Sequence, residues 1–288
     1  MPAYRFCRSD DIALLAGALN RCWDPYFPDE PPTTPAVFKQ SIRDLQVWCS
    51  SCMVAFSGPD PISVLIGAKR PSGTLVHKIA VHPDHRRQGH GRHLLASLGS
   101  KLAILGPPRI VAEIPETLAA ACELFSVSGY AEEARLTDYV WEPEEGAGRE
   151  RTGSDEFDGR FVIPVTVDDL AANGLLEEPG PQVSWKRSIE TITARKGEIV
   201  GLGVASEERI EAYLLYVSGS GEILSLRTFV DDGGARLRRL LGRLAASEVG
   251  GYRLPKVHPA EFSQVFMEGL GFRPAGGHVL YAATARSN

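Results

Sequence analysis

The stretch "RRQGHGRHLL", from Arg86 to Leu95, constrains the fold more than any other part of the chain. It follows a strand-like run that ends in "KIAV", and it leads into apolar residues with the 3.6-residue period of a helix. A strand, a glycine-rich turn and a helix in direct succession present the unpaired amides of the first helical turn at that junction. Together with the positive end of the helix dipole, such amides form an anion site.

The residues of this turn suit a phosphate or a diphosphate. Gly89 and Gly91 allow such a group to approach the backbone closely. Arginine binds phosphate through a planar fork of donors. Three arginines border the turn: Arg86, Arg87 and Arg92. A solvated basic turn remains the alternative interpretation of the same residues.

Two other phosphate-binding motifs do not fit this turn. A P-loop requires Gly-Lys-Ser/Thr, whereas Arg92 and His93 follow Gly91. A dinucleotide fingerprint requires a third glycine where Leu94 stands.

Composition limits the classes of partner and the compartment. A net charge of −5 indicates neither a nucleic-acid partner nor a membrane surface. We find no signal peptide and no apolar run long enough to span a membrane. Five cysteines without a regular spacing favour a reducing compartment, so we expect a cytoplasmic protein.

The chain of 288 residues divides near its middle. The stretch "EPEEGAGRERTGSDEFDG" has the composition of a linker, with many charges, four glycines and little apolar content. We therefore expect a first domain at residues 1–143, a linker at 144–160 and a second domain at 161–288.

The order of elements is similar in the two halves. In the first half we expect helices at 10–22, 36–45, 91–105 and 118–126, and strands at 52–56, 62–69, 74–81, 109–114 and 138–141. In the second half we expect strands at 191–194, 199–205, 209–217 and 222–229, a helix at 235–247 and a short helix before "LGF". The pairs Leu94-Leu95 and Leu240-Leu241 serve as matching landmarks and indicate a duplicated unit.

The run "KIAVHPDHRRQGHGRHLL" resembles the acetyl-CoA motif of the GCN5-related N-acetyltransferases (GNAT). The segment "LFSVSGY" at 124–130 is similar to that family's later helix-to-strand segment. The resemblance covers the first half and implies an α/β fold of the α+β mixed-sheet type. Each half would then hold a central mixed β-sheet with flanking helices, as in tandem members whose second copy is degenerate.

The resemblance also implies a cosubstrate, acetyl-CoA, and no metal. The pantetheine arm would lie between the diverging strands 74–81 and 109–114, with a backbone N–H near Ile79 polarising the thioester carbonyl. The residues expected to bind the cofactor are Ile79, Ala80, Val81, Arg86, Arg87, Gln88, Gly89, His90, Gly91 and Arg92.

The attacking amine must lose a proton and the leaving thiolate must gain one. His77 is the expected base, because strand alternation places residues 75, 77, 79 and 81 on one face and an imidazole titrates near neutral pH. Glu113 on the second strand is the rival base or an ammonium-binding carboxylate. Many family members carry a tyrosine that can protonate the thiolate at the position where this chain has Phe125. The proton donor is therefore left open.

We expect the amine acceptor near the loop that follows the first helix. Trp23, Tyr26 and Phe27 are predicted to bind the substrate in an apolar slot, and Asp24, Asp29 and Glu30 would attract an amine. An ordinary loop that tucks its aromatic side chains into the core is the competing interpretation.

The second half is expected to have lost its cofactor site. Alignment of the two leucine pairs places Asp232 opposite Arg86 and Ala235 opposite Gly89, and a carboxylate there repels a diphosphate. We therefore expect this half to be structural, to close one side of the acceptor site or to bind a partner.

The sequence thus predicts an N-acetyltransferase that transfers an acetyl group from acetyl-CoA to a small-molecule or peptide amine. A non-catalytic acyl-CoA-binding regulatory protein is the alternative that Phe125 permits. A tandem domain whose basic turn binds nothing is a third interpretation. The oligomeric state is left open.

Overall fold

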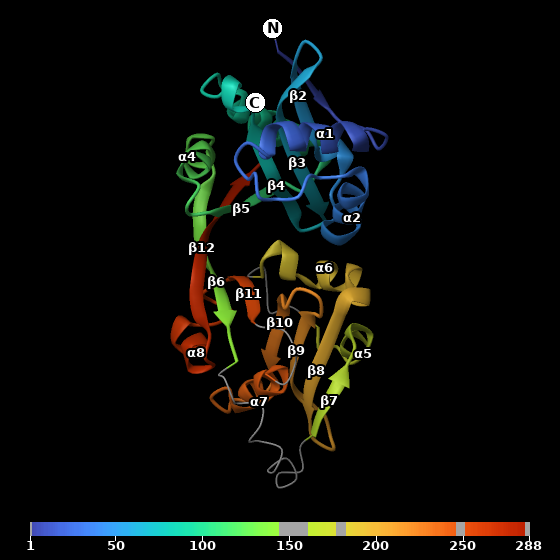
Figure 1. The fold of residues 1–288 in the computed structure, drawn as a ribbon, viewed down its shortest axis with the longest axis vertical. Coiled ribbons are helices and arrows are strands. Elements are labelled where there is room, and N and C mark those ends of the chain that lie inside the picture. Colours follow the sequence, from blue (N-terminus) through green and yellow to red (C-terminus); the bar gives the residue numbers. More distant parts are fainter. Residues whose placement is uncertain (1, 144–160, 177–182, 246–250, 286–288) are drawn as a thin grey trace. The chain divides into compact units, whose positions relative to one another are not determined.

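The computed structural model describes residues 2–143, 161–176, 183–245 and 251–285 (Figure 1). The chain forms two compact units, one of Met1–Ala134 with Val279–Asn288 and one of Arg135–His278. The C-terminal residues thus belong to the first unit. The sequence-based division at 143 stays a prediction, and the expected linker at 144–160 lies outside the described residues.

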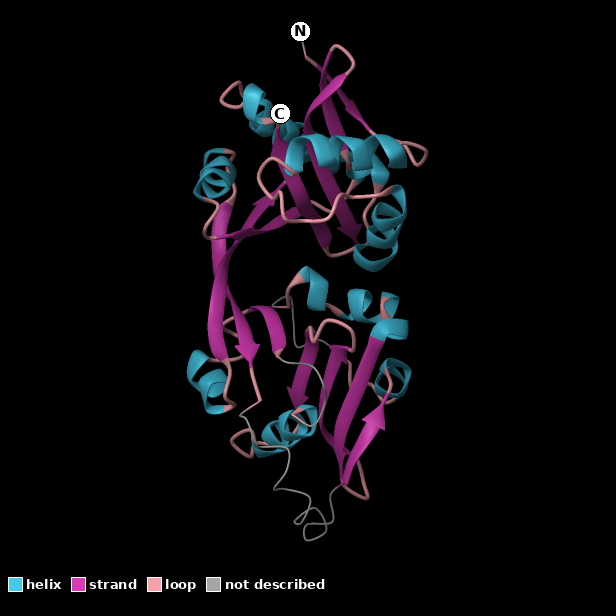
Figure 2. Ribbon diagram, in the orientation of Figure 1, coloured by secondary structure: helices cyan, strands magenta, loops and turns pink. Residues whose placement is uncertain are grey.

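The first unit is built on a mixed sheet with α-helices inserted between some of its strands along the chain (Figures 1 and 2). Its strands are β1 (Ala3–Phe6), β2 (Met53–Ser57), β3 (Asp60–Arg70), β4 (Gly73–Val81) and β5 (Arg109–Pro115). They follow the order β1-β2-β3-β4-β5, and β5 is followed by β12 (Arg273–Thr284) and β6 (Ala131–Trp141). The last strand of the chain is therefore inserted between two strands from the first half of the sequence.

Four α-helices accompany this sheet: α1 (Ile12–Trp23), α2 (Pro35–Leu45), α3 (His90–Leu105) and α4 (Ala119–Val127). A 3₁₀ turn at Pro83–His85 joins β4 to α3. The helical period of α3 places Leu94, Leu95, Leu98 and Leu102 in a core cluster with apolar residues of β5 and α4, whereas Leu105 at its end is exposed. Burial of each such side chain contributes about 1.5–3 kcal/mol, which fixes α3 on the sheet.

Strands β4 and β5 pair only at their beginnings. The parallel ladder consists of Thr74 opposite Ile110 and Leu75 opposite Val111. A bulge interrupts the register of β4 with β3 at His77, between Val76 and Lys78. Among the described residues no strand pairs with the outer edge of β4 beyond Leu75, so the two strands diverge as expected.

The second unit contains a four-stranded antiparallel sheet of order β10-β9-β8-β7. Its strands are β7 (Phe161–Val165), β8 (Ile199–Ala205), β9 (Ile210–Val217) and β10 (Ile223–Thr228), and β11 (Tyr252–Val257) pairs with β6. Its helices are α5 (Val167–Ala172), α6 (Ile189–Ala194), α7 (Ala235–Leu244) and α8 (Gln264–Gly269). Strand β10 carries a bulge at Leu224, and a single parallel bridge joins Glu222 to Arg253 of β11.

The mixed α/β fold class predicted from the sequence is confirmed, with one segment assigned wrongly. The expected strand at 191–194 is part of α6, because the Ser188 hydroxyl accepts a hydrogen bond from the Thr191 amide and begins a helix there. The strands β1, β7, β11 and β12 were not predicted. In the part of the chain that is described, no helix is long and apolar enough to cross a membrane.

Candidate functional site

The N-terminus of α3 presents backbone amides without a side-chain acceptor. Gly89 is its N-cap, with φ 86° and ψ 0°, and no described side chain caps the helix there. A Cβ on Gly89 would meet nothing within 4 Å, so the requirement for glycine is conformational. Any other residue would be strained by about 1–2 kcal/mol in this left-handed conformation.

Gly91 has a different role from the one expected. A Cβ at this position would lie 3.0 Å from Cδ2 of Leu124 on α4. The absence of a side chain therefore allows α3 to pack closely against α4, and the approach of a phosphate is not what requires it.

A pocket of about 340 Å³ lies at this helix terminus. It brings together seven of the predicted cofactor residues: Val81, Arg86, Arg87, Gly89, His90, Gly91 and Arg92. His85 also lines it, and its other wall, which was not predicted from the sequence, consists of Ala120, Glu123, Leu124 and Val127 from α4. Gln88 is exposed and does not line this pocket.

The charge at the rim of this pocket is mainly positive. Arg87 lies 3.8 Å from Glu123, but their side chains are 79% and 61% exposed, so this ion pair neutralises little. Arg87 also has φ 61°, an uncommon conformation for a residue with a side chain. Arg86 and Arg92 add two further exposed guanidinium groups.

His90 is the buried member of the turn. The hydroxyl of Tyr4 lies 2.5 Å from its Nδ1, and its Nε2 is buried with no hydrogen-bond partner among the described residues. Burial lowers the pKa of His90, and His85 and His93 lower it further, so the imidazole is neutral near pH 7. No group of three metal-ligating side chains occurs among the residues that the structure describes.

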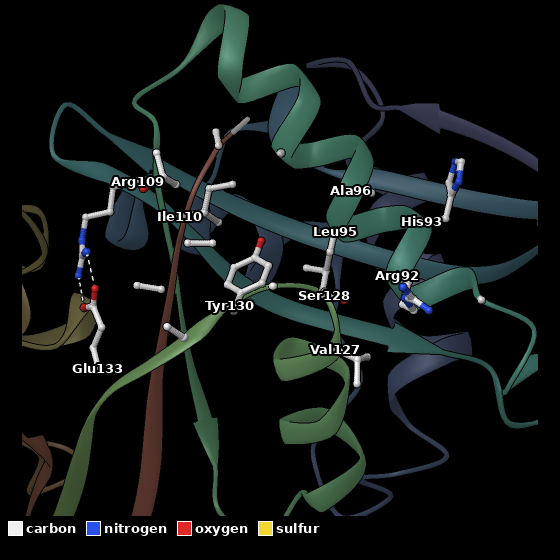
Figure 3. A pocket seen from close by; sticks show the side chains of 18 residues that line it. Arg92, His93, Leu95, Ala96, Arg109, Ile110, Val127, Ser128, Tyr130 and Glu133 are labelled. Carbon is white, nitrogen blue, oxygen red and sulfur yellow. Dashed lines mark hydrogen bonds and ion pairs between the residues drawn. The ribbon is translucent and has the colours of Figure 1, made fainter. Parts of the chain in front are cut away.

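A larger cavity of about 870 Å³ adjoins the turn and shares Gly89, Arg92 and Val127 with the smaller pocket (Figure 3). Its walls are α3, the turn from α4 into β6, the beginning of β5 and the end of β12. Arg109 and Glu133 meet at one side of it, with Nη1 of Arg109 donating to Oε1 of Glu133 at 2.8 Å. The sequence did not predict this cavity, because its walls come from segments far apart in the chain.

A third pocket, of about 380 Å³, follows the outer edge of β4. It unites the predicted acceptor residues Trp23, Tyr26 and Phe27 with Ile79, Ala80 and Val81, facing Thr117–Ala121 and Leu124. The rings of Trp23 and Phe27 are stacked with centroids 4.6 Å apart. Glu30 was expected to attract an amine, but its carboxylate accepts a hydrogen bond from the Trp23 indole at 3.0 Å and lies 3.4 Å from Nζ of Lys78.

The two candidate bases are half-buried and lie on the diverging strands. The bulge at His77 interrupts the strand alternation, so the expected placement of His77 on the face of Ile79 does not follow from the period alone. Glu113 alternates with core residues of β5 and therefore lies on the sheet face away from α3. The described residues that line the three pockets include neither side chain, and both roles stay predictions.

Phe125 is fully buried, with its ring 5.0 Å from that of Tyr130 and 5.8 Å from that of Tyr281. Burial raises the pKa of Tyr130 far above its usual value. Tyr130 is thus a poor source of a proton at neutral pH.

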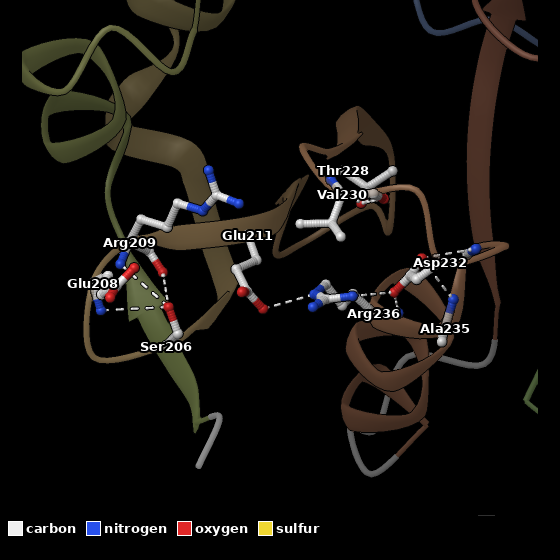
Figure 4. Close-up of polar contacts among 10 residues, drawn as sticks. Ser206, Glu208, Arg209, Glu211, Thr228, Val230, Asp232, Ala235 and Arg236 are labelled. Atoms are coloured by element: carbon white, nitrogen blue, oxygen red, sulfur yellow. Dashed lines mark hydrogen bonds and ion pairs between the residues drawn. The ribbon is translucent and has the colours of Figure 1, made fainter. Parts of the chain in front are cut away.

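The corresponding helix of the second unit is capped by its own chain (Figure 4). Gly234, with φ 83° and ψ 15°, takes the place that the sequence alignment had given to Ala235. The carboxylate of Asp232 accepts hydrogen bonds from the amides of Gly234 at 2.9 Å, Ala235 at 3.1 Å and Arg236 at 3.0 Å. Arg236 binds this carboxylate and that of Glu211, each at 2.7 Å.

The divergence of β10 and β11 is also bridged from within the second unit. Nε of Arg187 donates to the carbonyl of Leu224, the bulge residue of β10, at 3.2 Å. Its guanidinium forms two hydrogen bonds with Glu261, at 2.9 and 2.5 Å. The Arg187 and Glu261 side chains are 1% and 14% exposed, so the ion pair is part of the interior.

Known proteins agree with this description. The model of the acetyltransferase (GNAT) family matches residues 15–130, which lie in the first unit. The comparison with curated proteins gave no match.

Three solved structures align with nearly the whole chain. A GCN5-related N-acetyltransferase from Sphaerobacter thermophilus has a TM-score of 0.68 at 15% identity, covering 99% of this chain and 96% of that one. A tandem GNAT protein from the clavulanic acid biosynthesis pathway has a TM-score of 0.65 at 16% identity and covers 100% of both chains. A putative acetyltransferase from Pyrococcus horikoshii has a TM-score of 0.59 at 14% identity, with 99% and 90% covered. This chain therefore has the fold of two-unit GNAT proteins.

Proposed function

We propose that the first unit binds acetyl-CoA and transfers its acetyl group directly to an amine. The acceptor is a primary amine of a small molecule or an exposed amino group of a peptide. The observation that carries this proposal is the uncapped N-terminus of α3 beside the diverging strands β4 and β5.

Each of the three pockets is assigned to one part of acetyl-CoA. The diphosphate is assigned to the amides after Gly89 and to Arg86, Arg87 and Arg92. The nucleotide is assigned to the adjoining cavity of about 870 Å³. The pantetheine arm is assigned to the groove along Ile79–Val81, where the backbone groups at the edge of β4 that no described strand covers can bind its amides.

In the proposed reaction the amine nitrogen attacks the thioester carbon, the carbon–sulfur bond breaks and the thiolate leaves. The backbone amide of Ile79 stabilises the oxyanion that forms. His77 removes a proton from the ammonium form of the acceptor, so that the neutral amine can attack, with Glu113 as the alternative base. No metal takes part in this proposal.

The buried ring of Phe125 favours a second candidate function. A phenylalanine cannot protonate the thiolate, so the first unit could bind acyl-CoA as a regulatory domain without turning it over. Under the enzymatic proposal, the thiolate leaves unprotonated or takes its proton from water.

Release of free thiol from acetyl-CoA, measured with a panel of amines, tests the enzymatic proposal. We expect amine-dependent release that is reduced at least about tenfold in the His77→Ala variant, because general base catalysis contributes about 10²–10⁴-fold. Binding of acetyl-CoA without release for any amine would favour the regulatory function. Absence of binding would reject both.

A further inference from the structure

Tyr26, in the loop after α1, contacts two residues of the groove along β4, one through its hydroxyl and one through its ring. Its hydroxyl donates a hydrogen bond to the carbonyl oxygen of Val81 at 2.7 Å. The guanidinium carbon of Arg86 lies 5.6 Å from the centroid of its ring. Both partners belong to the residues that the proposed function assigns to coenzyme A.

The carbonyl of Val81 lies on the edge of β4 that faces away from β3. The amide of the next residue, His82, donates a hydrogen bond to the carbonyl oxygen of Ile62 in β3 at 2.9 Å. Backbone groups of successive strand residues point to opposite sides, so those of Val81 point toward the diverging strand. A carbonyl in this position needs a donor from outside the sheet, and Tyr26 supplies it.

We infer that the Tyr26 hydroxyl holds the place of a pantetheine amide on the Val81 carbonyl, so that coenzyme A must displace Tyr26 in order to bind. This inference rests on the proposed function. A diphosphate at the turn attracts the Arg86 guanidinium away from the ring, which weakens the second contact of Tyr26. An amide of the arm then donates to the Val81 carbonyl in place of the Tyr26 hydroxyl.

The displacement couples the two substrates. Tyr26 directly precedes Phe27, whose ring stacks on that of Trp23, and all three residues line the groove. Movement of Tyr26 therefore shifts the wall assigned to the acceptor. Burial raises the pKa of the Tyr26 phenol, although Arg86 opposes this, so the hydroxyl is protonated and can donate at neutral pH.

Titration calorimetry with two probes tests the inference. Coenzyme A carries the pantetheine arm, whereas adenosine 3′,5′-bisphosphate lacks it. In the Tyr26→Phe variant we expect coenzyme A to bind about 2- to 10-fold more tightly, because the competing hydrogen bond is lost. The affinity for the bisphosphate should be unchanged, and Tyr216→Phe in the second unit should change neither affinity.

Each other outcome is distinct. Equal affinity of wild type and Tyr26→Phe for coenzyme A, or weaker binding by the variant, overturns the inference and leaves the proposed function intact. Equal tightening for both probes also overturns it, because the effect would not depend on the arm. If wild type binds neither probe, the proposed function fails and the inference fails with it.

Discussion

The two units carry the same local structure at two helix termini and use it differently. In each unit a bulged strand leads through a turn to a left-handed glycine that begins a helix: Gly89 before α3 and Gly234 before α7. At Gly89 no described side chain accepts from the first amides. At Gly234 the carboxylate of Asp232 binds three of them.

The difference teaches how the same backbone structure can leave a helix terminus open in one unit and close it in the other. The segment from bulge to helix is shorter in the second unit, from Leu224 to Gly234, than in the first, from His77 to Gly89. An internal carboxylate satisfies the helix terminus that a ligand would otherwise satisfy. The buried guanidinium of Arg187 likewise bridges the diverging strands. We propose that the second unit is stabilised by the groups that prevent it from binding a cofactor.

The largest expected effect comes from removal of the buried charge in the second unit. Arg187→Met leaves Glu261 without its partner in the interior, which should lower the free energy of unfolding by about 3–5 kcal/mol. Urea denaturation measures this change. The matched control is Arg273→Met, because the side chains of Arg273 and its partner Glu142 are 65% and 61% exposed. This variant should lower the free energy of unfolding by less than about 1 kcal/mol. Similar losses in both variants would contradict the structural role of Arg187.

A carboxylate introduced at the corresponding position of the first unit should prevent coenzyme A from binding to the N-terminus of α3. Arg87 precedes Gly89 by the same two positions by which Asp232 precedes Gly234. In the Arg87→Asp variant we expect the affinity for coenzyme A to fall about 100-fold or more, because the carboxylate binds the amides and repels the diphosphate.

Arg87→Ala is the control for the loss of one exposed charge, and we expect it to cost less than about tenfold. Titration calorimetry distinguishes the two variants. Equal losses in both would mean that the amides after Gly89 are not the binding site.

The reverse change should destabilise the second unit. Asp232→Ala removes the cap of α7 and one partner of Arg236. We expect it to lower the free energy of unfolding by about 2 kcal/mol. The neighbouring Asp231 is exposed, so Asp231→Ala should change stability by about 0.5 kcal/mol or less. Comparable unfolding curves for the two variants would show that Asp232 does not support the helix.

The smallest expected effect is a dependence on pH. Burial alone would raise the pKa of Asp232, but hydrogen bonds from Arg236 and from the amides outweigh it and hold that pKa below its usual value. A depressed pKa stabilises the fold above the unfolded-state value of about 3.9 and ceases to do so as the pH falls through the folded value. The stability difference between wild type and Asp232→Ala should therefore be constant from pH 7 to 5 and shrink below about pH 4. A difference that is as large at pH 3 as at pH 7 would contradict this assignment.

The sequence was sufficient for most helices and strands of the first unit and for the strand–turn–helix junction at Gly89. The motif around Gly89 is local, because a strand, a turn and a helix that follow one another determine the position of the amides. The helical period and the turn residues identified α3 and α4 within a few residues of their observed ends.

The sequence could not reveal what depends on long-range contacts. Strand β12 contains Pro274 and two glycines, and its position beside β5 depends on pairing across most of the chain. The β-branched run at Thr191 suggested a strand, whereas the cap at Ser188 determines a helix. The match of Gly234 to Gly89 rests on backbone angles, and the leucine pattern alone misplaced it by one residue.

The central claim is that only the first of the two helix termini binds the cofactor, and the stoichiometry of coenzyme A binding tests it most directly. Titration calorimetry of the full chain should give one site, which Arg87→Asp abolishes and Asp232→Ala leaves in place. Two sites per chain, or one site that survives Arg87→Asp and disappears with Asp232→Ala, would contradict the account.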